Sequence, residues 1–169
     1  MNYGTAEQEI VNRLNTFIAD REKSAFYEAA LMPETEQQYT EFYSKFTKAR
    51  VVVQYVDSQY DPGLSTGIMV QEERVRFRLT YEAKKLRGDG GIHNLMELTK
   101  LALVGYRLSD SDRISVAKYG LLEFEQGAWQ PYLEFECKTL NAQLEGDDTT
   151  EAPLGGLLKA VGTLIDCDT

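Results

Sequence analysis

Few residues in this sequence could carry chemistry, and they centre on His93, the only histidine. A single imidazole excludes histidine-rich zinc sites and any mechanism that needs two imidazoles. His93 stands beside Asn94 where a helix is expected to begin, so hydrogen bonding to the first helical turn is its expected role. Cys137 falls on the apolar side of an expected strand, where a thiol acts as a small hydrophobic group. A Cys137–His93 nucleophilic pair is the weaker alternative.

The sequence Gly88-Asp89-Gly90-Gly91 precedes this helix and faintly resembles an anion cradle. It lacks the Gly-Lys-Ser/Thr ending and the dinucleotide fingerprint, and Asp89 would repel a phosphate. We expect instead a strand-to-helix turn with Asp89 near the helix cap. The acidic pairs Glu72-Glu73 and Asp147-Asp148 lack the spaced ligands of a calcium loop, so solvated charge is expected. We therefore expect no catalytic residue, no metal and no cofactor.

Arg74, Arg76 and Arg78 alternate along an expected strand and would lie about 7 Å apart on one face. In water each neighbouring pair repels by only about 0.6 kcal/mol, so an exposed face tolerates the row. A covered face would need carboxylates. The later strands offer acidic rows, and cross-strand pairing could satisfy both charges, with pairing inside the chain slightly favoured over pairing between subunits. The acidic residues are Glu123, Glu125, Glu134 and Glu136.

The strand that carries these arginines is predicted over residues 68–83, with Val75, Phe77, Leu79 and Tyr81 on its other face. Sixteen residues at about 3.3 Å each would span about 53 Å, whereas a compact domain of this length is about 40 Å across. The strand must therefore bulge, coil or project. A preceding strand over residues 50–56, apolar on both faces, joins it through a turn at Pro62-Gly63. A projecting hairpin of this kind can add strands to a neighbouring subunit.

Three helices are expected. The first has Thr5 and Gln8 in a capping-box pattern and ends near residues 20–23. Pro33 is expected to open the second, which reaches about Lys48 with an aromatic stripe for the core or for a neighbouring subunit. The stripe consists of Tyr39, Phe42, Tyr43 and Phe46. The third, over residues 92–106, is apolar nearly all round and is expected to be covered on more than one side, by the sheet and by a second subunit.

Two further strands are expected over residues 114–124 and 129–140, joined at Gln126-Gly127. Residues 146–153 form a polar loop, and the apolar stretch 154–165 is either a weak helix or a docking arm. The expected fold is a single α/β (α+β) domain over residues 1–169. Its sheet is mostly antiparallel, with about four strands flanked by helices and a long projecting β-hairpin.

The composition disfavours binding to nucleic acid or membranes, and solubility alone is the favoured interpretation of the acidic balance. Of 169 residues, 27 are acidic and 18 basic, and the net charge of −9 repels phosphate backbones and anionic bilayers. Ten tyrosines supply rigid side chains with a polar tip, which suit interfaces and core edges. Two distant cysteines, no basic or apolar leader and no spanning apolar run indicate synthesis on the cytoplasmic side.

The central block resembles the Mu-like tail-terminator family of contractile phage tails. The resemblance covers roughly residues 10–106 and rests on pattern and order. It is carried by Val-Val-Val-Gln-Tyr-Val-Asp-Ser-Gln-Tyr at 51–60, by Gln71 with the alternating strand, and by Leu86-Arg87-Gly88 and Gly91 before the helix. Leu95-Met96-Glu97-Leu98 and Leu103-Val104-Gly105-Tyr106 complete it. The aromatic helix at 35–48 and the tail after Glu145 fall outside the resemblance.

The resemblance implies a homo-hexameric ring that caps the head-proximal end of the tail tube, stops its growth and meets the tube protein, the sheath protein and the neck or connector proteins. The protein would be made in the host cytoplasm and belong to the virion tail, or to a cell-encoded contractile particle. DNA would pass through the ring without specific binding. A neck adaptor or a sheath-associated component is the alternative, and a small soluble enzyme or binding module using His93 and Asp89 is the least favoured. The expected subunit contacts are Arg74, Arg76, Arg78, Tyr81, Leu95, Met96 and Tyr106.

Overall fold

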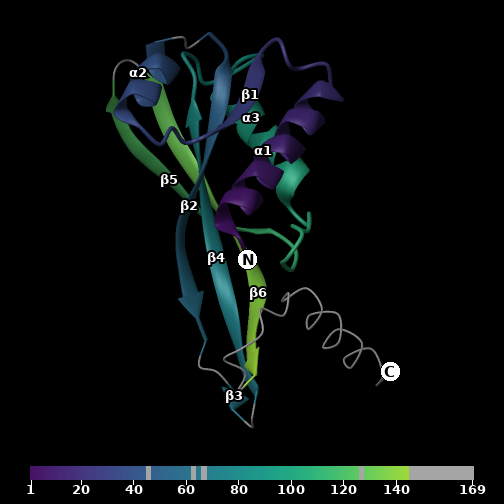
Figure 1. Cartoon of the computed structure of the whole chain (residues 1–169). Helices are drawn as coiled ribbons and strands as arrows, with labels where there is room; N and C mark the ends of the chain where they lie inside the picture. Colours follow the sequence, from purple (N-terminus) through teal and green to yellow (C-terminus); the bar gives the residue numbers. More distant parts are fainter. Residues whose placement is uncertain (45–46, 62–63, 66–67, 126–127, 145–169) are drawn as a thin grey trace.

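The computed structural model describes residues 1–44, 47–61, 64–65, 68–125 and 128–144 (Figure 1). Within these ranges three helices and six strands form an α+β fold. The helices are α1 (Tyr3–Ala19), α2 (Glu36–Ser44) and α3 (Ile92–Leu103). The strands are β1 (Tyr27–Leu31), β2 (Ala49–Tyr60), β3 (Leu64–Ser65), β4 (Ile68–Glu82), β5 (Ser115–Glu125) and β6 (Ala128–Leu144).

One sheet contains all six of these strands. Its main path runs β1-β2-β4-β6-β5, and the short β3 pairs with β4. Only the β1–β2 pair is parallel, so the prediction of a mostly antiparallel sheet with flanking helices is confirmed. The expected number of about four strands was too low. The strand β1 was not predicted, because residues 24–33 have no clear helical or strand periodicity in the sequence. This strand is held instead by its parallel pairing with β2.

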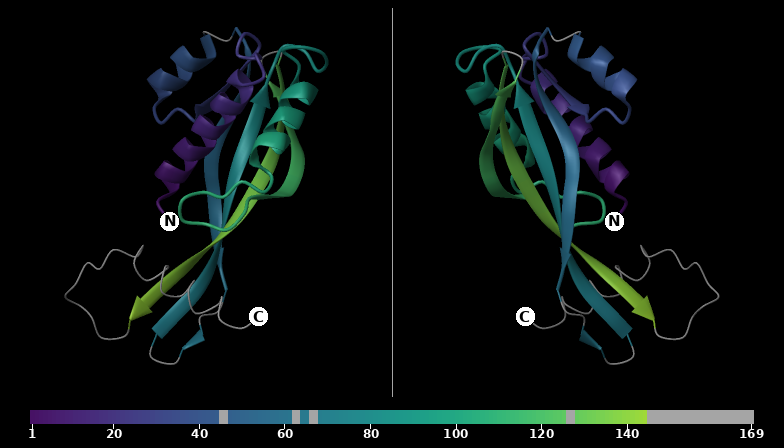
Figure 2. Two further views of the ribbon diagram at one scale, coloured as in Figure 1. Left: turned by 90° about the vertical axis from the view of Figure 1, so that its right-hand side faces the viewer. Right: turned by 90° about the vertical axis from the view of Figure 1, so that its left-hand side faces the viewer.

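The hydrophobic core lies on the sheet face that α1 and α3 cover (Figure 2). Val75, Phe77 and Leu79 of β4 alternate toward this face and are buried, as predicted. Leu14 of α1 and Leu95 of α3 belong to the same buried cluster. The alternation leaves the arginines of β4 on the opposite face.

Helix boundaries depart from the prediction at three ends. Asn2, rather than Thr5, caps α1, and its side-chain oxygen accepts from the Thr5 amide at 3.1 Å. The second helix begins at Glu36 rather than at Pro33, after Thr35 accepts from a first-turn amide. Helix α3 stops at Leu103, three residues earlier than expected, because the chain turns extended and then left-handed at Gly105.

Part of the sheet projects beyond the helices. Strands β2, β4 and β6 continue past the end of α1 that carries the N-terminus (Figures 1 and 2). The register of β2 against β4 shifts between Tyr55 and Asp57, which marks a β-bulge where the strands leave the covered region. The predicted projecting hairpin is therefore confirmed, and β6 adds a third strand to it along its whole length.

Candidate interaction surfaces

The arginine row lies on the sheet face that α1 and α3 do not cover, and it is paired within the chain. The Arg76 guanidinium binds Asp57 in a bidentate fashion, with N–O distances of 2.7 and 2.5 Å. Arg78 donates to Glu134 at 2.8 Å. Arg74 is half-exposed and stays 3.6 Å from Asp61. The favoured prediction of pairing inside the chain is confirmed.

The carboxylates in these pairs are only partly those predicted. Glu134 was expected, whereas Asp57 belongs to the preceding strand and is brought opposite Arg76 by the bulge in β2. Glu136 is the cross-strand neighbour of Arg76 in the register of β4 and β6. The side chains of Glu123 and Glu125 lie outside the described part of the chain.

Three of the expected subunit contacts lie inside the core. Tyr81 and Leu95 are fully buried and Met96 nearly so. They offer no surface to a second subunit, because the sheet and the two helices of this chain already cover them. Tyr106 is partly buried, with the Arg13 guanidinium 5.0 Å from its ring centroid. Of the seven expected contacts, the arginines are the ones that reach a broad open face.

The exposed apolar side chains lie elsewhere, on α3 and β5. Leu101 of α3 is 65% exposed and Val104 is also exposed. The chain alone therefore leaves the outer face of α3 open, and its cover by a second subunit stays a prediction. On β5, Tyr119 is 60% exposed and Leu121 is similarly exposed. Tyr119 lies opposite the buried Leu133 in register, so it shares the helix-covered side of the sheet. Strand β5 ends the sheet's main path and pairs on one side only within the described structure.

A buried carboxylate fastens the projecting strands to α1. Glu73 accepts from the hydroxyls of Tyr3 and Tyr60 at 2.6 and 3.0 Å and from the Asn141 amide at 2.9 Å. Burial alone would raise the pKa of Glu73, but hydrogen bonding from Ser58, together with these three donors, outweighs burial and holds the pKa below its usual range. The Tyr3 ring also stacks on Tyr55 with centroids 4.3 Å apart. The expectation of a solvated Glu72-Glu73 pair was wrong for Glu73.

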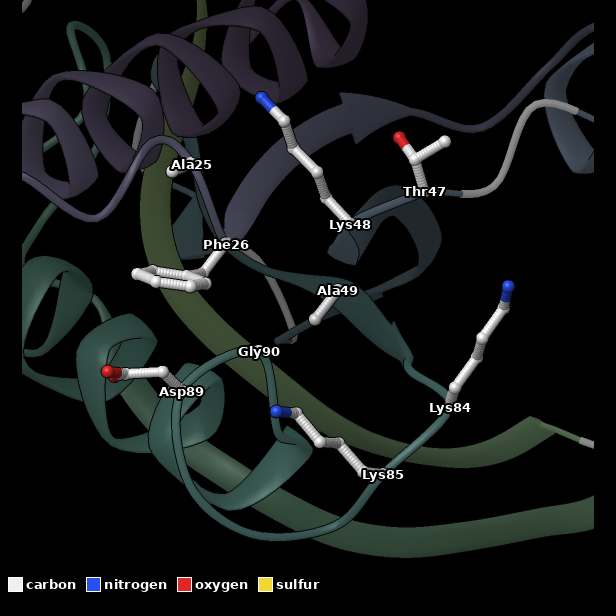
Figure 3. Close-up of a pocket in the computed structure, with 9 residues that line it drawn as sticks. All are labelled: Ala25, Phe26, Thr47, Lys48, Ala49, Lys84, Lys85, Asp89 and Gly90. Carbon is white, nitrogen blue, oxygen red and sulfur yellow. The ribbon is translucent and has the colours of Figure 1, made fainter.

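A pocket of about 400 Å³ is shown in Figure 3. Two of its residues, Lys84 and Lys85, come just after the end of β4, so it lies at the end of the sheet opposite the hairpin. Lys48, Lys84 and Lys85 line it together with Phe26 and the single carboxylate Asp89. The Lys48 ammonium donates to a backbone carbonyl at 2.7 Å. Because Asp89 is already paired with a lysine outside the lining, at 2.9 Å, the pocket is locally basic in an acidic chain.

The residues considered for catalysis are dispersed. His93 is exposed at the start of α3, where its backbone amide donates to the carbonyl of Leu86. Gly91 caps this helix, and Asp89 pairs with Lys23 instead of capping it. Cys137 is buried on the apolar side of β6, as expected, and burial raises its pKa. A thiol in such a site has little nucleophilic thiolate.

Within the described ranges, no three His, Cys, Asp or Glu side chains lie close enough to hold a metal ion. None of the helices in these ranges has the length and apolar character that a bilayer crossing requires.

The model of the Gp37 protein family matches residues 10–161. This chain belongs to the Gp37 family. The match makes it a member of a phage protein family, in agreement with the phage origin that the resemblance implied. No curated protein gives a significant match.

The match to the Gp37 family is longer than the resemblance predicted. It covers the segment around α2 and most of the tail after Glu145, which the resemblance left out. Three surfaces described above lie within the residues that the Gp37 family model matches. They are the projecting strands, the β5 edge with α3, and the lysine-lined pocket.

Proposed function

We propose that this Gp37 protein is the tail terminator of a contractile phage tail or of a related contractile particle. It forms a homo-hexameric ring on the head-proximal end of the tail tube. There it stops polymerisation of tube and sheath and offers a docking surface to the neck. It catalyses no reaction, and its place is the virion tail.

The observation that carries the proposal is the projecting half of the sheet. Strands β2, β4 and β6 extend past the helices that cover the rest of the sheet, so neither face of the extended part is covered by α1 or α3. A few strands without a covering layer contribute little stability of their own. Extended strands that leave their own core are well suited to packing on the sheet of another subunit, and this is how they would serve in a ring.

The edge strand β5 supports the proposal independently. It combines unpaired backbone groups on one side with exposed Tyr119 and Leu121. An edge of this kind readily pairs with another chain unless charges or a cover protect it. The hairpin and the β5 edge are unlike surfaces on different parts of the molecule, and a closed ring with one subunit type needs two unlike, complementary contacts.

The charge balance suits a ring around DNA. Six copies multiply the net charge of −9 sixfold. An acidic channel would not hold a phosphate backbone, because no counterions are released on contact. DNA would pass such a ring without specific binding.

Deletion of the gene in the phage or particle tests the proposal. Loss of a terminator is expected to give tubes and sheaths of uncontrolled length in negative-stain electron micrographs, and the wild-type gene should restore one length. Tails of normal length that fail to join heads would instead assign the protein to the neck. Normal, complete particles would overturn any role in the tail.

A second assay measures the oligomeric state of the purified protein. Native mass spectrometry is expected to show hexamers, either in solution or after docking on purified tail tubes. A chain that remains monomeric and binds neither tubes nor neck proteins would contradict the proposal. His93→Ala serves as the control, because a structural ring should assemble without the imidazole.

A further inference from the structure

The lysine-lined pocket and the hairpin lie at opposite ends of β4. The pocket lysines Lys84 and Lys85 follow the strand after one intervening residue. At the other end, the described part of β6 ends at Leu144, which pairs with Ile68 at the start of β4. The sixteen residue steps from Ile68 to Lys84 span about 53 Å at about 3.3 Å per step. The end of the described β6 and the pocket lysines are therefore about 53 Å apart along β4.

The segment that follows β6 is strongly acidic. Residues 145–151 read Glu-Gly-Asp-Asp-Thr-Thr-Glu, with four carboxylates and no basic residue. Seven residues reach at most about 25 Å even when fully extended. These carboxylates therefore cannot reach the lysines of their own chain, so a contact between the two groups would have to join two copies.

The pocket has the chemistry to receive such a segment. Lys48, Lys84 and Lys85 line the opening, with the Lys85 side chain turned toward Gly90, and the Phe26 ring lies on its other side (Figure 3). The one carboxylate in the lining, Asp89, is engaged by Lys23 at 2.9 Å. Opposite charges at an interface steer the encounter and fix its register.

We propose that residues 145–151 of one copy dock on the Lys48–Lys84–Lys85 pocket of the next copy. The contact joins the hairpin end of one subunit to the opposite end of its neighbour, and it is heterologous, the type of contact from which rings close. It deepens the proposed function by naming the segment and the surface that meet, and it rests on that function only for its place in a hexamer.

Disulfide trapping between full-length chains tests the contact. Two preparations with Cys167→Ser and different mass tags carry either Asp148→Cys or Lys85→Cys, and they are mixed under oxidising conditions at high protein concentration. We expect a disulfide heterodimer in mass spectrometry. Lys100→Cys is the matched control, because it places a thiol at another accessible lysine, on α3. Its yield is expected to be several-fold lower, and an equal yield would overturn the proposal.

Charge reversal supplies the second arm. Lys48→Glu with Lys84→Glu in the Lys85→Cys chain should lower the yield several-fold, and so should Asp147→Lys with Glu151→Lys in the Asp148→Cys chain. Mixing both reversed chains should restore it. High salt should also lower the wild-type yield, because attraction between exposed charges is screened. A disulfide yield that changes neither with charge reversal nor with salt would overturn the contact. Circular dichroism of each variant verifies that it is folded.

Nucleic acid is the competing occupant of a basic pocket. Short duplex DNA that binds the wild-type chain but not the Lys48→Glu, Lys84→Glu variant, without any heterodimer, would assign the pocket to phosphate and overturn the proposal. The trapping assay and the tail-length assay can fail separately. A trapped contact with normal tails removes only the terminator role, whereas uncontrolled tails without a trapped contact remove only this interface.

Discussion

The half of the sheet under α1 and α3 and the half that projects beyond them share β2, β4 and β6 but are held differently. In the covered half, Phe77 and Leu79 are buried against two helices. At the base of the projecting half, polar groups converge on Glu73. Non-directional burial fixes a core, whereas directional hydrogen bonds fix an angle between parts. The first half makes the chain fold, and the hydrogen bonds of the second fix how the projecting strands leave the helices.

The largest expected effect is in the covered half. Phe77→Ala should lower the free energy of unfolding by about 3–5 kcal/mol, because it removes a buried ring and leaves a cavity. Chemical denaturation monitored by circular dichroism measures this change. Leu121→Ala, at an exposed position, is the control and should stay within about 0.5 kcal/mol of wild type. Similar losses for both variants would show that β5 is covered even in the isolated chain.

The next effect concerns the ion pair between Arg50 and Glu82, which is buried on the face opposite the core with an N–O distance of 2.6 Å. Arg50 also donates to the carbonyl of Phe42 at 2.8 Å and so connects the sheet to α2. Glu82→Gln should cost about 3 kcal/mol, because the guanidinium loses its counter-charge away from water. Thermal unfolding measures the loss, and hydrogen exchange should show α2 opening before α3. Unchanged protection of α2 would contradict the connection.

Glu73 should give a smaller effect with a distinctive pH dependence. Glu73→Gln should cost about 1–3 kcal/mol at neutral pH, because an amide accepts less well from Tyr3 and Tyr60. The folded pKa of Glu73 lies below its unfolded value, so its share of stability is full above about pH 4.3 and is lost as pH falls through the folded pKa. The difference between wild type and variant should therefore shrink on acidification. Denaturation curves at several pH values measure it, and a pH-independent difference would contradict the assigned pKa direction.

The smallest effect on stability should come from β5. Tyr119→Ser with Leu121→Ser should change the free energy of unfolding by no more than about 0.5 kcal/mol, because both side chains are already exposed. The same double variant should weaken hexamer formation or binding to tail tubes several-fold in native mass spectrometry. Arg107→Ser, at an exposed position outside β5, is the control. Unaltered assembly would remove β5 from the contact surface.

Local periodicity was enough to place β4 and its two faces. The alternation of Val75, Phe77 and Leu79 with arginines is a property of consecutive residues, and the strand's length alone indicated the projection. The carboxylates that pair with the arginines were harder to predict from the sequence. Glu134 stands on an expected acidic row, but Asp57 reaches Arg76 through a bulge that composition does not reveal.

Surface and core could not be separated from sequence where both are apolar. Leu95 and Leu101 are equally hydrophobic members of one helix, yet the first is fully buried and the second mostly exposed. The difference depends on where α1 and the sheet pack, which is a tertiary property. Glu73 was missed for the same reason, since its donors Tyr3 and Asn141 are 70 and 68 residues away in the chain.

The bulge between Tyr55 and Asp57 has a consequence for how such chains diverge. One extra residue bends and twists a strand locally while the pairing on either side persists. A single-codon insertion or deletion there would change the direction of the projecting parts of β2, β4 and β6 and leave the hydrophobic core unchanged. Lineages could thereby adjust the diameter or pitch of an assembly without redesigning the domain from which it is made.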